Sequence, residues 1–139
     1  MKKLGLLLLV MILWSVGMTT NYQNLCDFEV DGTYYLFLPN TTTPLVTDCS
    51  QASSLLQNTK NISAECIKTT YTQQTMQDLS AFLSYTIIAQ EHIDQLHIIY
   101  AYSPYLKGNI VMHGQKANLQ LAIAEDALWI GYPILYGGY

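Results

Sequence analysis

The spacing of hydrophobic residues indicates one amphipathic helix in the middle of the chain. Between residues 72 and 84 the apolar positions recur every three or four residues: Met76, Leu79, Phe82 and Leu83. Polar side chains, glutamines above all, fill the positions between them. A helix with a single apolar stripe buries that stripe against a neighbouring element and leaves its other side in water. We therefore expect this helix to pack on one face of a sheet.

The pattern after residue 84 is alternating or continuously apolar, which is typical of β-strands. Strands are expected there over residues 85–90, 95–102, 109–113, 117–124 and 128–136, with one more ahead of the helix over 63–70. Turn-forming residues, including His113 beside Gly114, separate the last three strands. These three should form an antiparallel meander.

The N-terminal half predicts a hairpin and a short helix. Asp31-Gly32 lies between two apolar runs within residues 28–38, and Asp-Gly is a favoured hairpin turn because both residues tolerate positive φ. The proline-bounded segment 39–44 should be an exposed loop, and residues 50–58 should form a short helix. Together the elements predict an α+β fold, in which a mostly antiparallel sheet carries one main helix on one face.

The first 20 residues have the pattern of a targeting segment. Lys2 and Lys3 precede an uncharged apolar run of about 15 residues, which is short for a membrane span. A secretory signal peptide fits this run, although no small-residue cleavage triplet follows it, and an uncleaved N-terminal membrane anchor is the alternative. In both cases residues 21–139, enough for a single domain, are expected outside the cytoplasm, secreted or held at the outer face of the membrane.

The charge of the domain argues against a nucleic-acid partner. The chain has 6 lysines and no arginine against 10 acidic residues, and removal of Lys2 and Lys3 takes the formal net charge from −4 to −6. Binding to phosphates requires clustered basic side chains, whereas the remaining lysines are scattered. Partners should be envelope proteins or cell-wall components, or the membrane itself if the N-terminal segment is uncleaved.

Three cysteines, Cys26, Cys49 and Cys66, leave at least one thiol without an intramolecular partner. A disulfide between Cys49 and Cys66 is favoured, because each flanks a predicted structured segment. In the chain-entropy view, closing a loop of about 16 residues stabilises a fold by ~3 kcal/mol. The alternative is three buried free thiols, since cysteine packs well as a small apolar residue.

Side chains able to do catalysis or hold a metal form one dense group, Glu91, His92, Asp94 and His97. The two histidines are five residues apart, a spacing that suits neither one helix face nor one strand face. The chain contains no HExxH or G-x-S-x-G motif. We therefore expect no catalytic, cofactor-binding or metal-binding residues, and an enzyme using Glu91, His92 or His97 ranks third among the functions considered.

The eleven tyrosines suggest an aromatic surface for peptides or glycans, because tyrosine combines a flat apolar ring with a hydroxyl. Tyrosine is also a favoured strand residue that covers half-buried sheet surface without binding anything. The candidate surface-binding residues are Tyr102, Asn118, Gln120 and Tyr136.

The C-terminal part resembles a known family. The residues that carry the resemblance are Tyr102-Ser103-Pro104, the run from Gly114 to Ala122, and Gly131-Tyr132-Pro133-Ile134. They are similar to the end of the YwmB-like family, exported proteins typical of spore-forming Firmicutes whose fold is similar to that of the TATA-box-binding protein. The resemblance covers about the last 50 residues, and family members are about twice as long as the domain. It implies a TATA-box-binding-protein-like fold, or half of one, and a link to sporulation.

These observations favour a non-enzymatic exported domain that acts through protein or envelope contacts. The alternative from the composition is a tyrosine-rich module that binds peptide or glycan.

Overall fold

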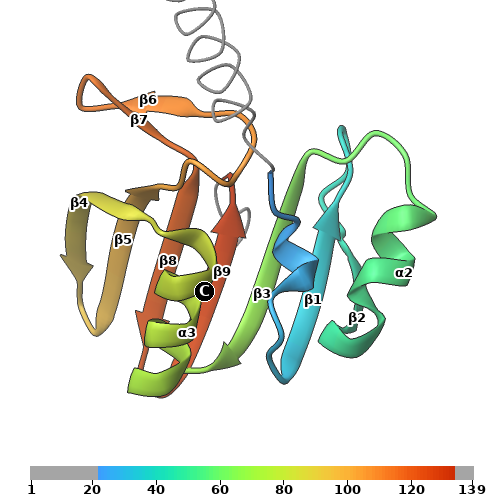
Figure 1. Cartoon of the computed structure of the whole chain (residues 1–139), viewed down its shortest axis with the longest axis horizontal. Helices are drawn as coiled ribbons and strands as arrows, with labels where there is room; N and C mark the ends of the chain where they lie inside the picture. Colours follow the sequence, from blue (N-terminus) through green and yellow to red (C-terminus); the bar gives the residue numbers. More distant parts are fainter. Residues whose placement is uncertain (1–21, 134–139) are drawn as a thin grey trace, which may run out of the picture.

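The computed structural model describes residues 22–133, in which a curved seven-stranded sheet is the main feature (Figure 1). The strand order is β2-β1-β3-β9-β8-β5-β4, and every pairing is antiparallel. The strands are β1 (Gly32–Phe37), β2 (Leu45–Asp48), β3 (Ala64–Thr70), β4 (Thr86–Ile93), β5 (Leu96–Tyr102), β8 (Leu119–Ala124) and β9 (Ala127–Tyr132). The expected α+β class with a mostly antiparallel sheet is confirmed. The predicted targeting segment and Tyr136 lie outside the described residues.

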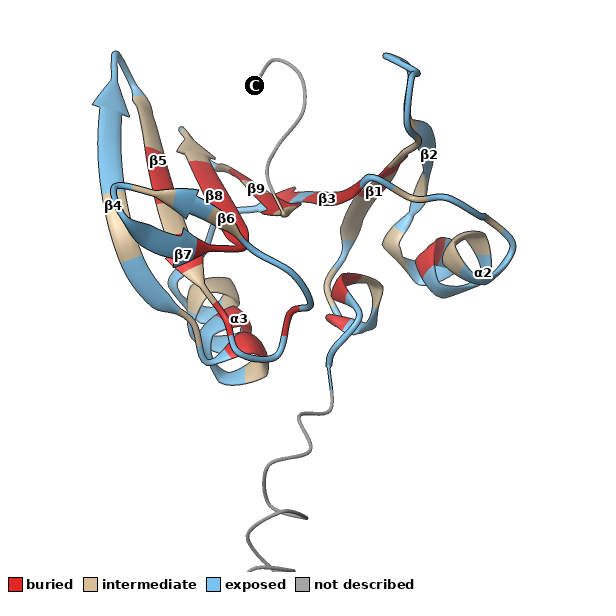
Figure 2. Ribbon diagram, turned by 90° about the horizontal axis from the view of Figure 1, so that it is seen from above, coloured by how far each residue is buried: buried red, intermediate tan, exposed pale blue. Residues whose placement is uncertain are grey.

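All helices of the described chain lie on the same face of the sheet (Figure 2). They are two 3₁₀ helices, η1 (Leu25–Asp27) and η2 (Cys49–Gln51), and two α-helices, α2 (Ala52–Gln57) and α3 (Gln73–Leu83). Thr72 caps α3, because its hydroxyl oxygen accepts a hydrogen bond from the backbone N–H of Thr75 at 3.0 Å. Ser84 ends α3 in the left-handed region, at φ 47°. Both predicted helices are present. No helix within residues 22–133 is long and apolar enough to cross a membrane.

The core lies between the helices and the helix-side face of the sheet. Leu79 and Leu83 of α3 are fully buried, and Met76 and Phe82 pack against the same cluster, so the predicted apolar stripe is confirmed. The Phe28 ring, just after η1, lies 5.6 Å from the Phe82 ring, centroid to centroid. The sheet contributes Tyr34, Leu36, Ile67, Leu121 and Ile130.

The opposite face of the sheet is concave. Figure 2 shows the outer strands, β4 on one side and β2 on the other, rising away from the side that carries α2 and α3. Side chains alternate between the two faces of a strand. The residues next to each core position therefore point into this concave face.

The hairpin predicted around Asp31-Gly32 is wrong. Residues 25–27 form η1, and Gly32 is the first residue of β1 instead of a turn residue. Gly32 pairs with Thr69, and a Cβ atom built on it would lie 2.3 Å from the Lys68 carbonyl oxygen. Glycine is thus required by a close approach of two strands, which a local reading of Asp-Gly does not reveal.

The predicted meander is correct for two of its three strands. β8 pairs with β9 through the expected turn at Glu125-Asp126. The strand expected over residues 109–113 instead becomes β6 (Ile110–Met112), which pairs with β7 (Gln115–Ala117) in a separate two-stranded sheet. Its turn at His113-Gly114 is as predicted, and both residues have positive φ. β2, short and mostly exposed, was not predicted.

Candidate functional site

The concave face carries a row of aromatic and small side chains that crosses five strands. The sheet register aligns Tyr35 with Cys66, Cys66 with Gly131, Gly131 with Gln120 and Gln120 with Tyr100. The row therefore has tyrosines at both ends and small or amide residues between them. Trp129, half-buried, lies one row along on the same face.

A hollow of about 500 Å³ adjoins Trp129 on this face. Leu96, Ala124 and Ala127 line it as small or aliphatic residues, and Ile93, 53% exposed, also borders it. Three carboxylates complete the lining, Asp94 from the β4–β5 turn and Glu125 and Asp126 from the β8–β9 turn. We call these nine residues the Trp129 hollow: Ile93, Asp94, Gln95, Leu96, Ala124, Glu125, Asp126, Ala127 and Trp129. An apolar hollow with an acidic rim can hold a group that combines apolar surface with positive charge.

Lys68 lies over the Trp129 ring, with its Nζ 4.7 Å from the ring centroid. This contact is a cation–π interaction with a neighbour in β3, outside the hollow. The residue that pairs with Trp129 from β8 is Ala122, which has a small side chain. The ring is thus held by Lys68 on the β3 side and borders the hollow.

The four residues predicted to bind ligands at the surface have different positions. Tyr102 is half-buried at the end of β5, on the same face as Tyr100. Gln120 is on this face too but is only 2% exposed. Asn118 is fully buried, and Tyr136 lies outside the described residues. The structure thus brings Tyr102 and Gln120 to the concave face and places Asn118 elsewhere.

Asn118 organises the loop after β5. Its Oδ1 accepts from the backbone N–H of Ser103 at 2.8 Å, and its Nδ2 donates to the carbonyls of Ser103, Leu106 and Gly108. A buried amide with its hydrogen-bonding groups engaged in this way fixes the loop and offers no surface to a ligand. The residue is structural.

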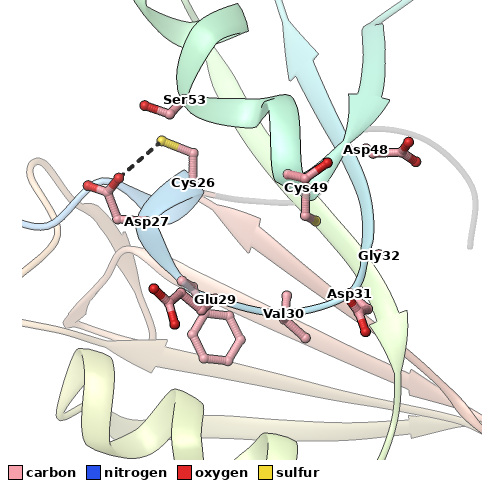
Figure 3. Close-up of a pocket in the computed structure, with 11 residues that line it drawn as sticks. Cys26, Asp27, Glu29, Val30, Asp31, Gly32, Asp48, Cys49 and Ser53 are labelled. Atoms are coloured by element: carbon pink, nitrogen blue, oxygen red, sulfur yellow. Dashed lines mark hydrogen bonds between the residues drawn. The ribbon is translucent and has the colours of Figure 1, made fainter.

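A pocket between η1 and η2 is lined by two of the three cysteines (Figure 3). It has a volume of about 860 Å³, and Cys26 from η1 and Cys49 from η2 line it. Burial, with Asp27 nearby, raises the pKa of Cys26 to about 12. Burial and Asp48 raise the pKa of Cys49. Because the thiolate is the nucleophile, the raised pKa values lower the reactivity of both thiols.

All three cysteines are free in the structure, so the disulfide between Cys49 and Cys66 stays a prediction. Cys49 begins η2, directly after β2, and Cys66 lies on β3, with β1 between the two strands.

His92 and His97 are directly opposite each other in the β4–β5 hairpin. Their rings stack with centroids 4.1 Å apart, and His97 Nε2 lies 2.8 Å from Gln90 Oε1. Partial burial and His92 lower the pKa of His97. The two histidines, five residues apart, thus lie on neighbouring strands, and the two-residue turn between β4 and β5 brings their rings together. No three histidine, cysteine or carboxylate side chains within residues 22–133 form a group able to hold a metal.

Glu65 and Tyr34 form a hydrogen-bonded pair in the core that the sequence did not indicate. The Tyr34 hydroxyl donates to Glu65 Oε1 at 2.6 Å, and Glu65 is 7% exposed. Burial raises the pKa of Glu65, an effect that the Tyr34 hydrogen bond opposes. The burial of Glu65 could not be predicted from the sequence, because it depends on which face of β3 packs against the core.

Comparison with known protein families, curated proteins and solved structures finds no match to this chain.

Proposed function

We propose that the chain is an exported, non-enzymatic domain whose concave sheet face binds a basic segment of an extracytoplasmic protein. The observation that carries this proposal is the Trp129 hollow, in which an indole and aliphatic side chains lie beside three carboxylates. A lysine or arginine side chain fits such a site, because its apolar stem contacts the hollow and its charge meets the acidic rim. The excess of acidic residues over the whole chain favours the same partner.

Export is part of the proposal and rests on the N-terminal lysines and the apolar run. Residues 1–25 fused to a reporter that is active only outside the cytoplasm should deliver external activity. An inactive fusion, with the reporter confirmed inside, would count against export and leave the binding surface to be tested separately.

The finer assignment to the YwmB-like family and to a TATA-box-binding-protein-like fold is also a proposal. Its support is a concave antiparallel sheet with the helices on the other face (Figure 2). The three strands β1 to β3 and the four strands β4, β5, β8 and β9 differ in their connections, so any two-fold likeness of the halves is limited. The excess of acidic residues argues against the DNA-binding role that the fold name suggests.

Binding is tested with a defined probe, an acetylated hexapeptide of alternating lysine and leucine labelled with a fluorophore. Anisotropy should show saturable binding that weakens with salt, and Trp129→Ala should weaken it at least about tenfold, as for loss of an aromatic anchor. The control is Asp78→Asn, which removes one exposed acid on α3, on the other side of the sheet. Equal affinity in the wild type and Trp129→Ala would refute the proposal.

The second candidate is glycan binding, which Trp129 and the tyrosines of the concave face favour. The test is co-sedimentation of the protein with purified cell-wall glycan. Sedimentation that is lost in Trp129→Ala, together with no binding of the hexapeptide, would establish glycan binding in place of binding to a basic segment.

A further inference from the structure

Glu65 is the one buried ionisable carboxyl among residues 22–133, and it serves no role in the proposed binding face. It lies on β3 in register with Leu36 of β1 and Tyr132 of β9, on the helix side of the sheet. One of its oxygens, Oε1, accepts the hydrogen bond from Tyr34.

The second carboxylate oxygen of Glu65 makes no hydrogen bond within residues 22–133. No fully buried side-chain oxygen or nitrogen of the described chain lacks a partner, so this oxygen is not sealed in the core. Glu65 borders a pocket of about 220 Å³, whose other lining residues are Ile62, Ser63, Ala64, Lys107, Tyr132 and Pro133. The oxygen therefore opens into this pocket, which we call the Glu65 pocket.

The pocket supplies several hydrogen-bond acceptors close together. Besides the carboxylate, these are the hydroxyl oxygens of Ser63 and Tyr132. Both hydroxyls donate their protons elsewhere, Ser63 to the Phe37 carbonyl at 3.1 Å and Tyr132 to the Lys107 carbonyl, so their oxygens remain able to accept a hydrogen bond. A primary ammonium group has three donors and no acceptor, which matches this set.

Lys107 lines the same pocket but is not among the groups that shift the pKa of Glu65, so Glu65 is not paired with its charge. Burial raises the pKa of Glu65, and the negative charge of nearby Asp27 raises it further. A buried carboxylate without a cation is costly, and a bound cation removes that cost.

We propose that the Glu65 pocket binds the ammonium group of a small primary amine, with Glu65 as its counter-ion. The volume of the pocket limits the ligand to a few non-hydrogen atoms, below the range typical of drug-sized sites. This site is on the other side of the sheet from the Trp129 hollow, so the two proposals are independent.

The test is a titration of the full-length protein with ethylammonium chloride, followed by NMR of the backbone amides of β3 and β9. Saturable shifts at Glu65 and Tyr132 are expected, and Glu65→Gln should weaken binding at least about tenfold through loss of the charged hydrogen bond. Glutamine keeps an acceptor for the Tyr34 hydroxyl, so the variant retains the core hydrogen bond.

Three controls make the result decisive. Asp78→Asn, which removes an exposed acid on α3 that does not shift the pKa of Glu65, should leave the affinity unchanged. Ethanol and tetramethylammonium, which lack either the charge or the N–H donors, should produce no saturable shift. Equal binding by Glu65→Gln, equal binding by tetramethylammonium, or no saturable shift with ethylammonium in the wild type would each overturn the proposal.

Discussion

Burial controls the acid–base behaviour of three side chains in the N-terminal half of the chain. Glu65, Cys26 and Cys66 all have raised pKa values, and desolvation is the largest cause for each. Each group is therefore held in its neutral form over a wider pH range than in an unfolded chain.

The first prediction concerns Glu65 and the pH dependence of stability. Its pKa in the folded protein lies above the ordinary 4.5, so the folded state holds the proton more tightly than the unfolded state. The stabilisation of the folded state that comes from this tighter proton binding is fully present below pH 4.5. It is lost as pH rises through the pKa of Glu65 in the folded protein, at up to about 1.4 kcal/mol per pH unit. Urea unfolding between pH 4.5 and 8 should show a shallower loss of stability in Glu65→Gln than in the wild type. Parallel curves would contradict this assignment.

The second prediction concerns thiol reactivity. Cys66 is 4% exposed, and burial raises its pKa to about 12 from 9.0. At pH 8 it should carry about a thousandfold less thiolate than an unfolded cysteine. Alkylation with iodoacetamide followed by mass spectrometry should label Cys66 far more slowly in buffer than in urea. Labelling of Cys66 at the same rate in both solutions would show that it is exposed.

At the scale of single elements, α3 is the helix that closes the core. The third prediction is that Leu79→Ala lowers the free energy of unfolding by about 2–5 kcal/mol, because Leu79 is fully buried. Gln77→Ala, on the exposed side of the same helix, should change it by less than about 0.5 kcal/mol. Similar losses from the two variants in urea titrations would mean that the helix does not pack by this stripe.

The fourth prediction concerns the junction of β1 and β3. A methyl group on Gly32 would meet the Lys68 carbonyl oxygen at 2.3 Å, which is backbone and has little freedom to move. Gly32→Ala should therefore destabilise the domain by about 1–3 kcal/mol, the cost typical of overpacking. Gly114→Ala, where no atom lies within 4 Å but φ is +74°, gives a comparison in which only backbone strain acts. A Gly32→Ala variant as stable as the wild type would show that the strands are not so close.

Local patterns predicted α3 and its buried face, since both depend on residues a few positions apart. They did not predict the role of Gly32 or the contact of His92 with His97, because strand register decides both. The Trp129 hollow was missed for the same reason. Asp94 and Glu125 are far apart in sequence and meet only when β5 pairs with β8. The sequence does show that Asp94 and Glu125 each lie in a turn after an apolar strand, which was the one indication that they could be near each other.

For the whole molecule, charge sets which partners can approach. The fifth prediction is that the domain does not bind nucleic acid, because affinity for phosphates comes mainly from clustered basic side chains and here the acids outnumber the lysines. A gel-shift assay at low salt with duplex DNA and single-stranded RNA should show no complex. A salt-sensitive shift would contradict this expectation and reopen the role implied by the TATA-box-binding-protein-like fold.

The order of the strands also determines when the protein can fold. The N-terminal strands β1, β2 and β3 join the rest of the sheet only through the pairing of β3 with β9, which links residues 64–70 to residues 127–132. Contacts so distant in sequence form late and slow the folding reaction. During synthesis, β3 has an unpaired edge until β9 has been made, and a chain truncated before residue 127 would keep that edge open to aggregation. The two parts of the sheet therefore join only after β9, the strand that connects them, has been made.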